Sequence, residues 1–129
     1  MPRPPTVGPT DGELEILRVL WDKGPSTVRQ VHESLKGKKA PGYTSTLKLM
    51  QIMTEKGLVL RDEWDRTHIY RPKQTEERTQ RILARHLLRR AFRGSTHKLV
   101  MHALSASKAS PRELSQIRKL LEELEGRGT

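Results

Sequence analysis

The chain has 129 residues, no cysteine and a formal net charge of +10. The lack of cysteine excludes disulfides, thiolate metal sites and cysteine-based redox sensing, and no apolar run approaches the ~18 residues that a membrane span needs. The excess of basic residues favours a polyanionic partner, most simply nucleic acid, although ribosomal, nucleoid and membrane-surface proteins share this property.

Composition also predicts how the chain is organised. The length allows one ordinary domain or two very small ones. Hydrophobic residues make up only 33% and aromatics 4%, so a monomer has little material for a deep core, and a partner subunit is expected to add stability. Residues 1–9 lack the apolar stretch of a signal peptide and are expected to form a flexible leader. The lack of cysteine agrees with a cytoplasmic protein.

Two short helices are expected at the start of the chain. Thr10 and Glu13 have the spacing of a capping box, and apolar residues follow as far as Trp21. The first helix should end at residues 23–25, because Gly can cap it and Pro cannot continue it. Ser26 is a suitable N-cap for a second helix of about ten residues, which leads into a basic connector.

A third helix is predicted to end at Gly57, because Gly can adopt the left-handed conformation that stops a helix. After Gly57 the apolar residues recur at every second position instead of at helical spacing, which is typical of strands. Leu58 and Leu60 alternate with their neighbours, residues 62–66 form a polar turn, and residues 67–71 resume the alternation. A β-hairpin is therefore expected directly after the third helix. The inward face of that helix is expected to carry Thr46, Leu49, Met50 and Met53.

Three helices and a hairpin in about 70 residues match a helix-turn-helix with a wing, whose third helix enters the DNA major groove. The opposite face of that helix would then meet DNA: Gln can pair with adenine, Thr can bond a phosphate or a base, and an apolar side chain can meet a thymine methyl. The expected outward residues are Thr44, Leu47, Lys48 and Gln51. Flanking contacts to the DNA backbone are expected from Lys38, Lys39, Arg66 and His68.

A less specific interpretation is that this is a polar helix face beside a solvated hairpin. Leu47 or Ile52 would lie in the core if the register of the helix differs by one residue. The pattern alone leaves both interpretations open.

A strongly amphipathic helix is predicted from Thr75, with leucines and alanines on one side and arginines on the other. Residues 1–72 have a net charge of +3 and residues 73–129 of +7, so most of the positive charge lies outside the proposed DNA-reading part. The arginine stripe is read first as solvated or flanking a dimer interface, with DNA phosphates or an acidic protein patch as alternatives. Its residues are Arg78, Arg81, Arg85, Arg89 and Arg93.

Two further helices are expected, at residues 96–104 and after a linker at residues 105–110. Ser110, Pro111 and Glu113 form a clear helix start. Three amphipathic helices this short cannot bury their apolar faces alone, so a two-fold dimer is expected, and it would present two reading heads to a palindromic site. The alternative is a monomer in which they pack on the first domain. The expected dimer interface comprises Leu83, Leu87, Leu88, Leu99, Val100, Leu114, Ile117, Leu120, Leu121 and Leu124.

The sequence thus predicts a mainly α fold with a small β-hairpin. A winged-helix domain at residues 10–73 would follow the leader at residues 1–9, and a helical dimerisation region at residues 74–126 would precede a tail at residues 127–129.

The chain resembles the penicillinase-repressor (BlaI/MecI-like) family of bacterial transcriptional regulators from about Thr10 to Leu124. The resemblance is carried by ELEILRVLWD at residues 13–22, YTST at 43–46, EKGLV at 55–59 and HIYRP at 68–72. The resemblance implies a homodimeric repressor whose partner is double-stranded DNA, a short operator with dyad symmetry. By position, it assigns Tyr43, Thr44, Ser45, Leu47 and Lys48 to the reading end of the third helix, and Arg66, Thr67 and His68 to the tip of the wing.

Departures from the family pattern limit what the resemblance implies. Leu47 stands where relatives often have a polar or basic residue, so an operator sequence does not carry over. Copper-responsive relatives have a C-terminal cysteine hook, which this chain lacks. In the β-lactam resistance branch, a membrane sensor protease triggers cleavage after an asparagine that precedes a phenylalanine. His102 and Ala103 occupy those positions here, which puts such a partner in doubt.

An enzyme and a charge-driven binding protein are the alternatives from other function classes. An enzyme would have to use scattered carboxylates and five histidines, and no nucleophile elbow, P-loop, HExxH or nucleotide fingerprint is present. His97 and His102 are five residues apart, which does not align them on one helix face, so neither a metal nor another cofactor is expected. The second rival is a nucleoid-associated or RNA-binding protein that uses charge without sequence preference.

Overall fold

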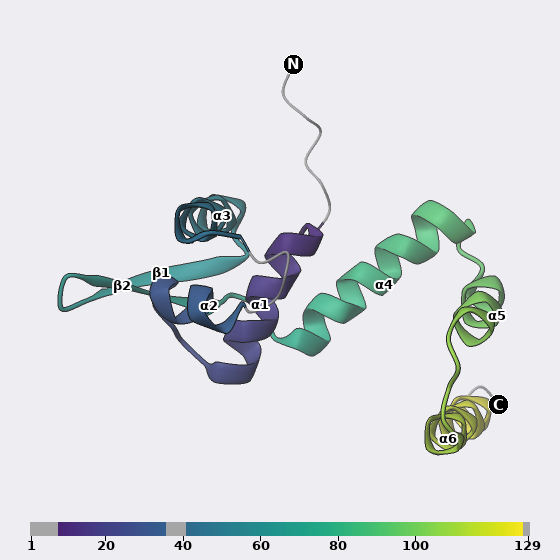
Figure 1. Cartoon of the computed structure of the whole chain (residues 1–129). Helices are drawn as coiled ribbons and strands as arrows, with labels where there is room; N and C mark the ends of the chain where they lie inside the picture. The colour runs from purple at the N-terminus through teal and green to yellow at the C-terminus, as the bar shows by residue number, and fades with distance from the viewer. Residues whose placement is uncertain (1–7, 36–40, 128–129) are drawn as a thin grey trace. The chain divides into compact units, whose positions relative to one another are not determined.

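A computed structural model of the chain describes residues 8–35 and 41–127 (Figure 1). Contacts divide it into two compact units, Met1–His86 and Leu87–Thr129. The boundary lies within one helix, whose first turns belong to the first unit. The elements in chain order are α1 (Asp11–Lys23), α2 (Val28–Ser34), α3 (Tyr43–Lys56), β1 (Val59–Trp64), β2 (Thr67–Pro72), α4 (Glu76–Phe92), α5 (Thr96–Ala106) and α6 (Pro111–Arg127).

The limits of α1 are those that its capping residues predict. The Thr10 hydroxyl accepts a hydrogen bond from the backbone N–H of Glu13, and the Glu13 carboxylate accepts one from the backbone N–H of Thr10. This capping box satisfies two N–H groups that have no partner within the helix. Gly24 follows with a φ of 87°, a conformation that Gly adopts without the steric cost of a side chain.

The start of α2 differs from the prediction. Thr27 is its N-cap, paired reciprocally with Gln30, and the helix has 7 residues rather than about ten. Ser26 instead forms a β-bridge with Tyr70: its N–H donates to the Tyr70 carbonyl over 3.0 Å, and its carbonyl accepts from the Tyr70 N–H over 2.8 Å. This long-range pairing, which local sequence cannot reveal, takes Ser26 away from the cap.

The predicted inward face of α3 is confirmed. Thr46, Met50 and Met53 are buried, and Leu49 is partly buried against the same core. The helix ends at Gly57, which is left-handed with a φ of 78°, as predicted.

The hairpin is longer and its turn tighter than the sequence predicted. Strand β1 continues to Trp64, so residues 62–64 are strand rather than turn, and only Asp65 and Arg66 connect the strands. Both have positive φ, 49° and 65°, as in a type I′ turn, whose twist matches that of a hairpin. In the antiparallel register, Trp64 is opposite Thr67. In Figure 1 the hairpin extends beyond the helices that pack at its base.

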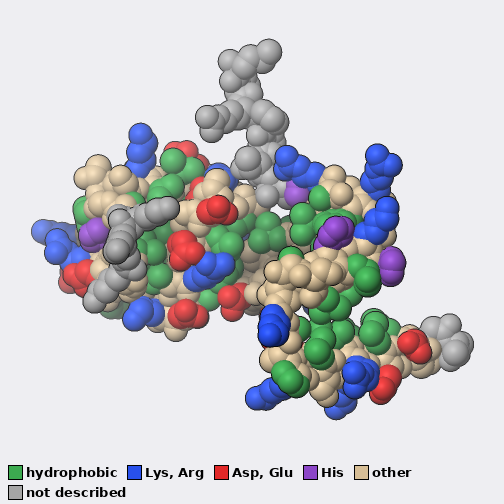
Figure 2. Space-filling model, turned by 45° about the vertical axis from the view of Figure 1, so that its right-hand side comes forward, with side chains coloured by type: hydrophobic (Ala, Val, Ile, Leu, Met, Phe, Trp, Pro, Cys, Tyr) green, Lys and Arg blue, Asp and Glu red, His purple; other side chains and the backbone are tan. Residues whose placement is uncertain are grey.

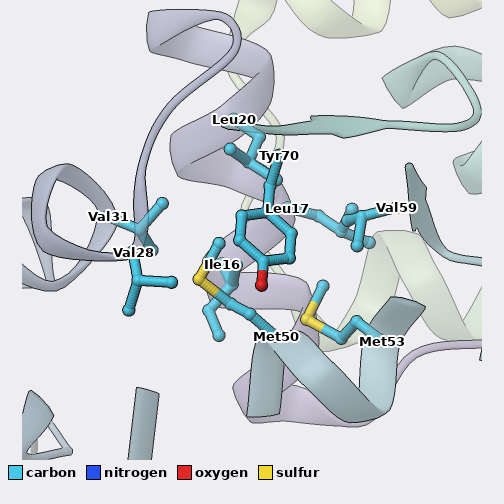
Figure 3. Close-up of a cluster of buried hydrophobic side chains, with 9 residues drawn as sticks. All are labelled: Ile16, Leu17, Leu20, Val28, Val31, Met50, Met53, Val59 and Tyr70. Carbon is cyan, nitrogen blue, oxygen red and sulfur yellow. The ribbon is translucent and has the colours of Figure 1, made fainter. Parts of the chain in front are cut away.

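The core of the first unit joins all three N-terminal helices to the hairpin. The Tyr70 ring lies in its middle, with the hydroxyl pointing toward Met50 and Met53 of α3 (Figure 3). Burial of this cluster fixes which face of α3 is turned inward, because the apolar residues of all five elements leave water together. Its buried members are Ile16, Leu17, Leu20, Val28, Val31, Met50, Met53, Val59 and Tyr70.

The start of α4 is attached to the first unit. The indole Nε1 of Trp21 donates to the carbonyl of Gln74 over 2.9 Å, and Thr79 in the first turn of α4 is buried. Further along, α5 continues to Ala106, so the predicted linker is shorter by two residues. The start of α6 is confirmed, with Ser110 and Glu113 forming both hydrogen bonds of a capping box.

The helices α5 and α6 contain no buried residue. Large apolar side chains remain exposed on them, with Leu120, Leu121 and Leu124 each more than half accessible. Figure 2 shows such hydrophobic side chains at the surface of the part that ends in the C-terminal residues. Within the described part of the chain, the helices are too short or too polar to cross a membrane.

Replacing Tyr70 with Ala is expected to lower the free energy of unfolding by about 3–5 kcal/mol, because it removes the aromatic ring at the centre of the core. Urea denaturation at fixed protein concentration measures the change. Glu63→Ala, an exposed position on the same hairpin, serves as the control and should change stability by less than ~0.5 kcal/mol. Equal effects of the two substitutions would contradict the central position of Tyr70.

Candidate nucleic-acid interface

The exposed face of α3 carries a row of polar side chains. Thr44, Lys48 and Gln51 recur three or four residues apart and are all exposed, on the side opposite the buried Thr46 and Met50. Lys48 forms no ion pair with a described residue. Its ammonium group and the Gln51 amide are therefore open to an external partner.

Two other residues predicted at the reading end of α3 are also exposed. The Tyr43 side chain is 44% accessible, and Ser45 lies in the first turn of the helix. The N-cap of α3 is Gly42, which has no side chain to bond the N–H groups of that turn. Lys38 and Lys39, predicted as contacts to the DNA backbone, lie outside the described residues.

Leu47 differs from the other predicted contacts. Its side chain is partly buried and packs against the hydrophobic core. Of the two residues whose orientation depended on the register, Ile52 is the more exposed, at 37%. Leu47 therefore lies at the edge between the core and the exposed face.

A partly buried ion pair joins the C-terminal end of α3 to the start of α1. The Lys56 ammonium lies 2.6 Å from a carboxylate oxygen of Glu13, whose side chain is only 3% exposed. Burial alone would raise the pKa of Glu13. The hydrogen bond from Lys56, the backbone N–H of Thr10 and the positive charge of Lys56 outweigh it, so this pKa lies below the ordinary value of 4.5. The carboxylate thus remains charged and holds both helices.

The hairpin presents the predicted wing residues to solvent. Arg66, Thr67 and His68 are all exposed around the two-residue turn. On its surface, the Arg71 guanidinium donates to the Asp62 carboxylate over 2.9 Å. The strands and their turn carry three arginines and three acidic residues, so the wing as a whole is electrically neutral.

The arginine stripe of α4 is exposed as the sequence predicted. Arg78, Arg81, Arg85 and Arg89 all lie at the surface, and none forms an ion pair with a described residue. Arg93 lies just past the end of the helix and has a positive φ of 49°. The stripe is thus a source of uncompensated positive charge.

The predicted dimer residues of α5 and α6 are uncovered to different extents. Leu114, Leu120, Leu121, Leu124 and Val100 are exposed, while Leu99 and Ile117 are partly buried. The predicted interface residues of α4 differ from one another in exposure. Leu87 is exposed and Leu88 is partly buried, whereas Leu83 approaches Gly8 of the same unit so closely that an added Cβ would lie 2.7 Å from it.

Sequence reasoning missed two residues that contact the start of α3. The Arg29 guanidinium lies over the Tyr43 ring at 5.9 Å from its centroid, and the His32 ring meets the same ring edge-on at 5.8 Å. The i, i+3 spacing of Arg29 and His32 places both on one face of α2. That spacing was a possible signal, but only the packing of α2 on α3 shows what it faces. Trp64 was also missed: it is 74% exposed, and it had been assigned to the turn.

No group of three or more His, Cys, Asp or Glu residues able to hold a metal ion occurs in the described part of the chain. The polar residues that the fold brings together on α3 are instead donors and acceptors for hydrogen bonds. Such a surface can recognise base edges and phosphates.

Three packed helices followed by a hairpin, with a polar exposed face on the third helix, define a winged-helix fold of the kind used by transcriptional regulators. The sequence profile of the penicillinase repressor family matches residues 9–123. The chain therefore belongs to that family. Its class is that of transcriptional regulators and not of enzymes.

The chain is also similar to named relatives and to solved structures. The chain is 32% identical over 118 residues to the transcriptional regulator BlaI of two Mycobacterium tuberculosis strains, covering 88% of this chain and 84% of BlaI. The structure of transcriptional regulator Tm0710 from Thermotoga maritima is 18% identical with a TM-score of 0.47, over 91% and 74% of the two chains. A mutant of ZitR from Lactococcus lactis is 17% identical with a TM-score of 0.46, over 100% and 82%.

Glu13→Gln is expected to lower the free energy of unfolding by about 1.5–3 kcal/mol at neutral pH, because it removes the charge from a buried hydrogen-bonded pair. Because the pKa of Glu13 is lowered in the folded state, its charge contributes fully to stability at pH values above 4.5, the ordinary glutamate pKa. It is lost as the pH falls through the lower pKa of the folded state.

Urea midpoints of the wild type and of Glu13→Gln should therefore converge on acidification. Glu15→Gln, which removes an exposed partner of Arg18, is the control and should cost less than ~0.5 kcal/mol. A difference between wild type and Glu13→Gln that stays constant down to acidic pH would contradict the role of the charge.

Proposed function

We propose that this protein is a sequence-specific transcriptional repressor that binds a dyad-symmetric operator as a homodimer in the cytoplasm. The observation that carries the proposal is the row of Thr44, Lys48 and Gln51 on the exposed face of α3, a helix whose other face forms the core. A helix held in this way can enter the major groove without losing its packing.

In this proposal, the residues of α3 have distinct tasks. Gln51 pairs with adenine through its amide, Lys48 reaches a guanine edge or a phosphate, and Thr44 bonds a base or the backbone. Leu47 contributes the part of its side chain that the core leaves free, against a thymine methyl group. Contacts to the sugar-phosphate backbone come from Lys38, Lys39, Ser45, Arg66, Thr67 and His68.

The uncovered apolar faces of α5 and α6 support the homodimer. Six leucines and valines are exposed on these two helices, which contain no buried residue. Their exposure to water is unfavourable, and a second copy of the chain would cover them. A two-fold axis relates two identical reading heads, so the operator is expected to be a palindrome. The proposal contains no cleavage by a membrane sensor protease, because His102 and Ala103 replace the asparagine and phenylalanine of the β-lactam branch.

A second candidate is a nucleoid-associated or RNA-binding protein that uses charge alone. The unpaired arginines of α4 favour it, because they supply attraction for phosphates without reading a sequence. The two functions differ in discrimination. A duplex enriched from a random pool by the full-length protein should bind ~10³-fold or more tightly than unselected duplex if the protein is a repressor. Equal affinity at physiological salt, or no enrichment, would reject the repressor.

Gln51→Ala and Lys48→Ala are each expected to weaken binding to the enriched duplex by about 1–3 kcal/mol, because each removes a contact from the exposed face of α3. Fluorescence anisotropy measures the affinity, and the melting temperature should not change. Gln80→Ala, an exposed glutamine on α4, is the matched control. A lower melting temperature without loss of binding would mean that this face of α3 packs against protein.

Leu121→Glu is expected to shift the protein from dimer to monomer, because it places a carboxylate in the apolar face of α6, where the leucine is 52% exposed in the monomer. Sedimentation equilibrium measures the mass. Ser115→Glu adds the same charge to the polar side of α6 and should leave the dimer intact. If both variants remain dimers, α6 is not part of the dimer interface.

A further inference from the structure

The cluster of Arg29, His32 and Tyr43 joins α2 to the first residue of α3. Arg29 is exposed, and it forms no ion pair with a described residue. Its guanidinium lies over the Tyr43 ring, while the His32 ring meets that ring at an interplanar angle of 88°. The ring is thus contacted from two positions on α2.

This cation–π contact at 5.9 Å leaves the N–H groups of Arg29 free to form hydrogen bonds. A guanidinium that lies on an aromatic face still directs its N–H groups outward in its own plane, in the fork that matches a phosphate. The contact with the ring also restricts the side chain before any ligand arrives, which reduces the entropy lost when it binds. Arg29 is therefore a preorganised cation with no acidic partner in the described protein.

The charges near α3 show why such a cation matters for DNA. Lys56 is occupied by Glu13 at 2.6 Å, and the wing has equal numbers of arginines and acidic residues. Among the described residues of α3, Lys48 alone supplies a positive charge that is not in an ion pair. A duplex seated on α3 therefore needs positive charge from a neighbouring element.

We propose that Arg29 binds a phosphodiester of the DNA backbone beside the bases read by α3, and that Tyr43 is a positioning residue that holds its guanidinium. This inference rests on the proposed function, because it takes α3 as the helix that meets the duplex. Arg29 contributes affinity for any sequence, whereas Tyr43 acts through its ring and not through its hydroxyl.

Four full-length variants test the proposal: Arg29→Gln, Tyr43→Leu, Tyr43→Phe and the double variant of Arg29→Gln with Tyr43→Leu. Arg29→Gln should weaken binding to the enriched and to the unselected duplex by the same factor, about tenfold. The slope of log affinity against log salt should fall by about one, which is the signature of one lost phosphate contact.

The role of Tyr43 predicts coupling. Tyr43→Leu should weaken binding in the wild type and have little further effect in the Arg29→Gln background, whereas Tyr43→Phe should bind as the wild type does. Arg18→Gln, an exposed arginine of α1 paired with Glu15, is the control for charge removal and should leave the salt slope unchanged. Circular dichroism and melting temperature verify that each variant is folded. If Arg29→Gln unfolds the protein, Arg29→Lys should keep the slope and lose affinity.

The outcomes separate this inference from the proposed function. If the wild type prefers the enriched duplex but Arg29→Gln keeps the full salt slope, the phosphate contact is wrong and the repressor stands. If Tyr43→Phe binds as weakly as Tyr43→Leu, the hydroxyl is the contact and the positioning role is wrong. If the wild type shows no preference for any duplex, the repressor fails, whatever Arg29 does to the affinity.

Discussion

The packing of α3 against α1 and the hairpin is the constraint on which the rest of the structure depends. Thr46, Met50 and Met53 are buried on one face, with the Tyr70 ring between them and the other helices. When one face of a helix is buried, the opposite face must point to solvent. The exposed positions of Thr44 and Lys48 therefore follow from the packing of the core. The polar surface of α3 is thus a consequence of its apolar packing.

Charge is distributed unevenly over this scaffold, and the distribution separates two tasks. The described residues around α3 have few free cations, and the wing is neutral, while residues 73–129 have a net charge of +7. Contacts with base edges discriminate between sequences, whereas attraction by unpaired arginines raises affinity for every duplex. In the proposed repressor, discrimination therefore comes mainly from α3, and much of the general affinity comes from elsewhere.

Local patterns predicted α1, α3 and α6 well, because their limits depend on residues that are close in sequence. The capping box of Thr10 and Glu13 and the left-handed Gly57 are such signals. The cap of α2 was misplaced because Ser26 pairs with Tyr70, 44 positions away, and no local rule distinguishes Ser26 from Thr27. The partial burial of Leu47 was equally hidden, because it depends on how tightly neighbouring helices approach.

The contact of Arg29 with Tyr43 shows most clearly what a pattern cannot provide. Each residue is unremarkable in its own helix: Arg29 is an exposed cation of α2, and Tyr43 is the first residue of α3. Their combined chemistry arises only when the two helices pack, because a flexible arginine becomes a directed one when a ring lies under its guanidinium. The helix-turn-helix therefore does more than orient α3. The packing of α2 on α3 also places the Arg29 guanidinium beside Tyr43, at the N-terminal end of α3.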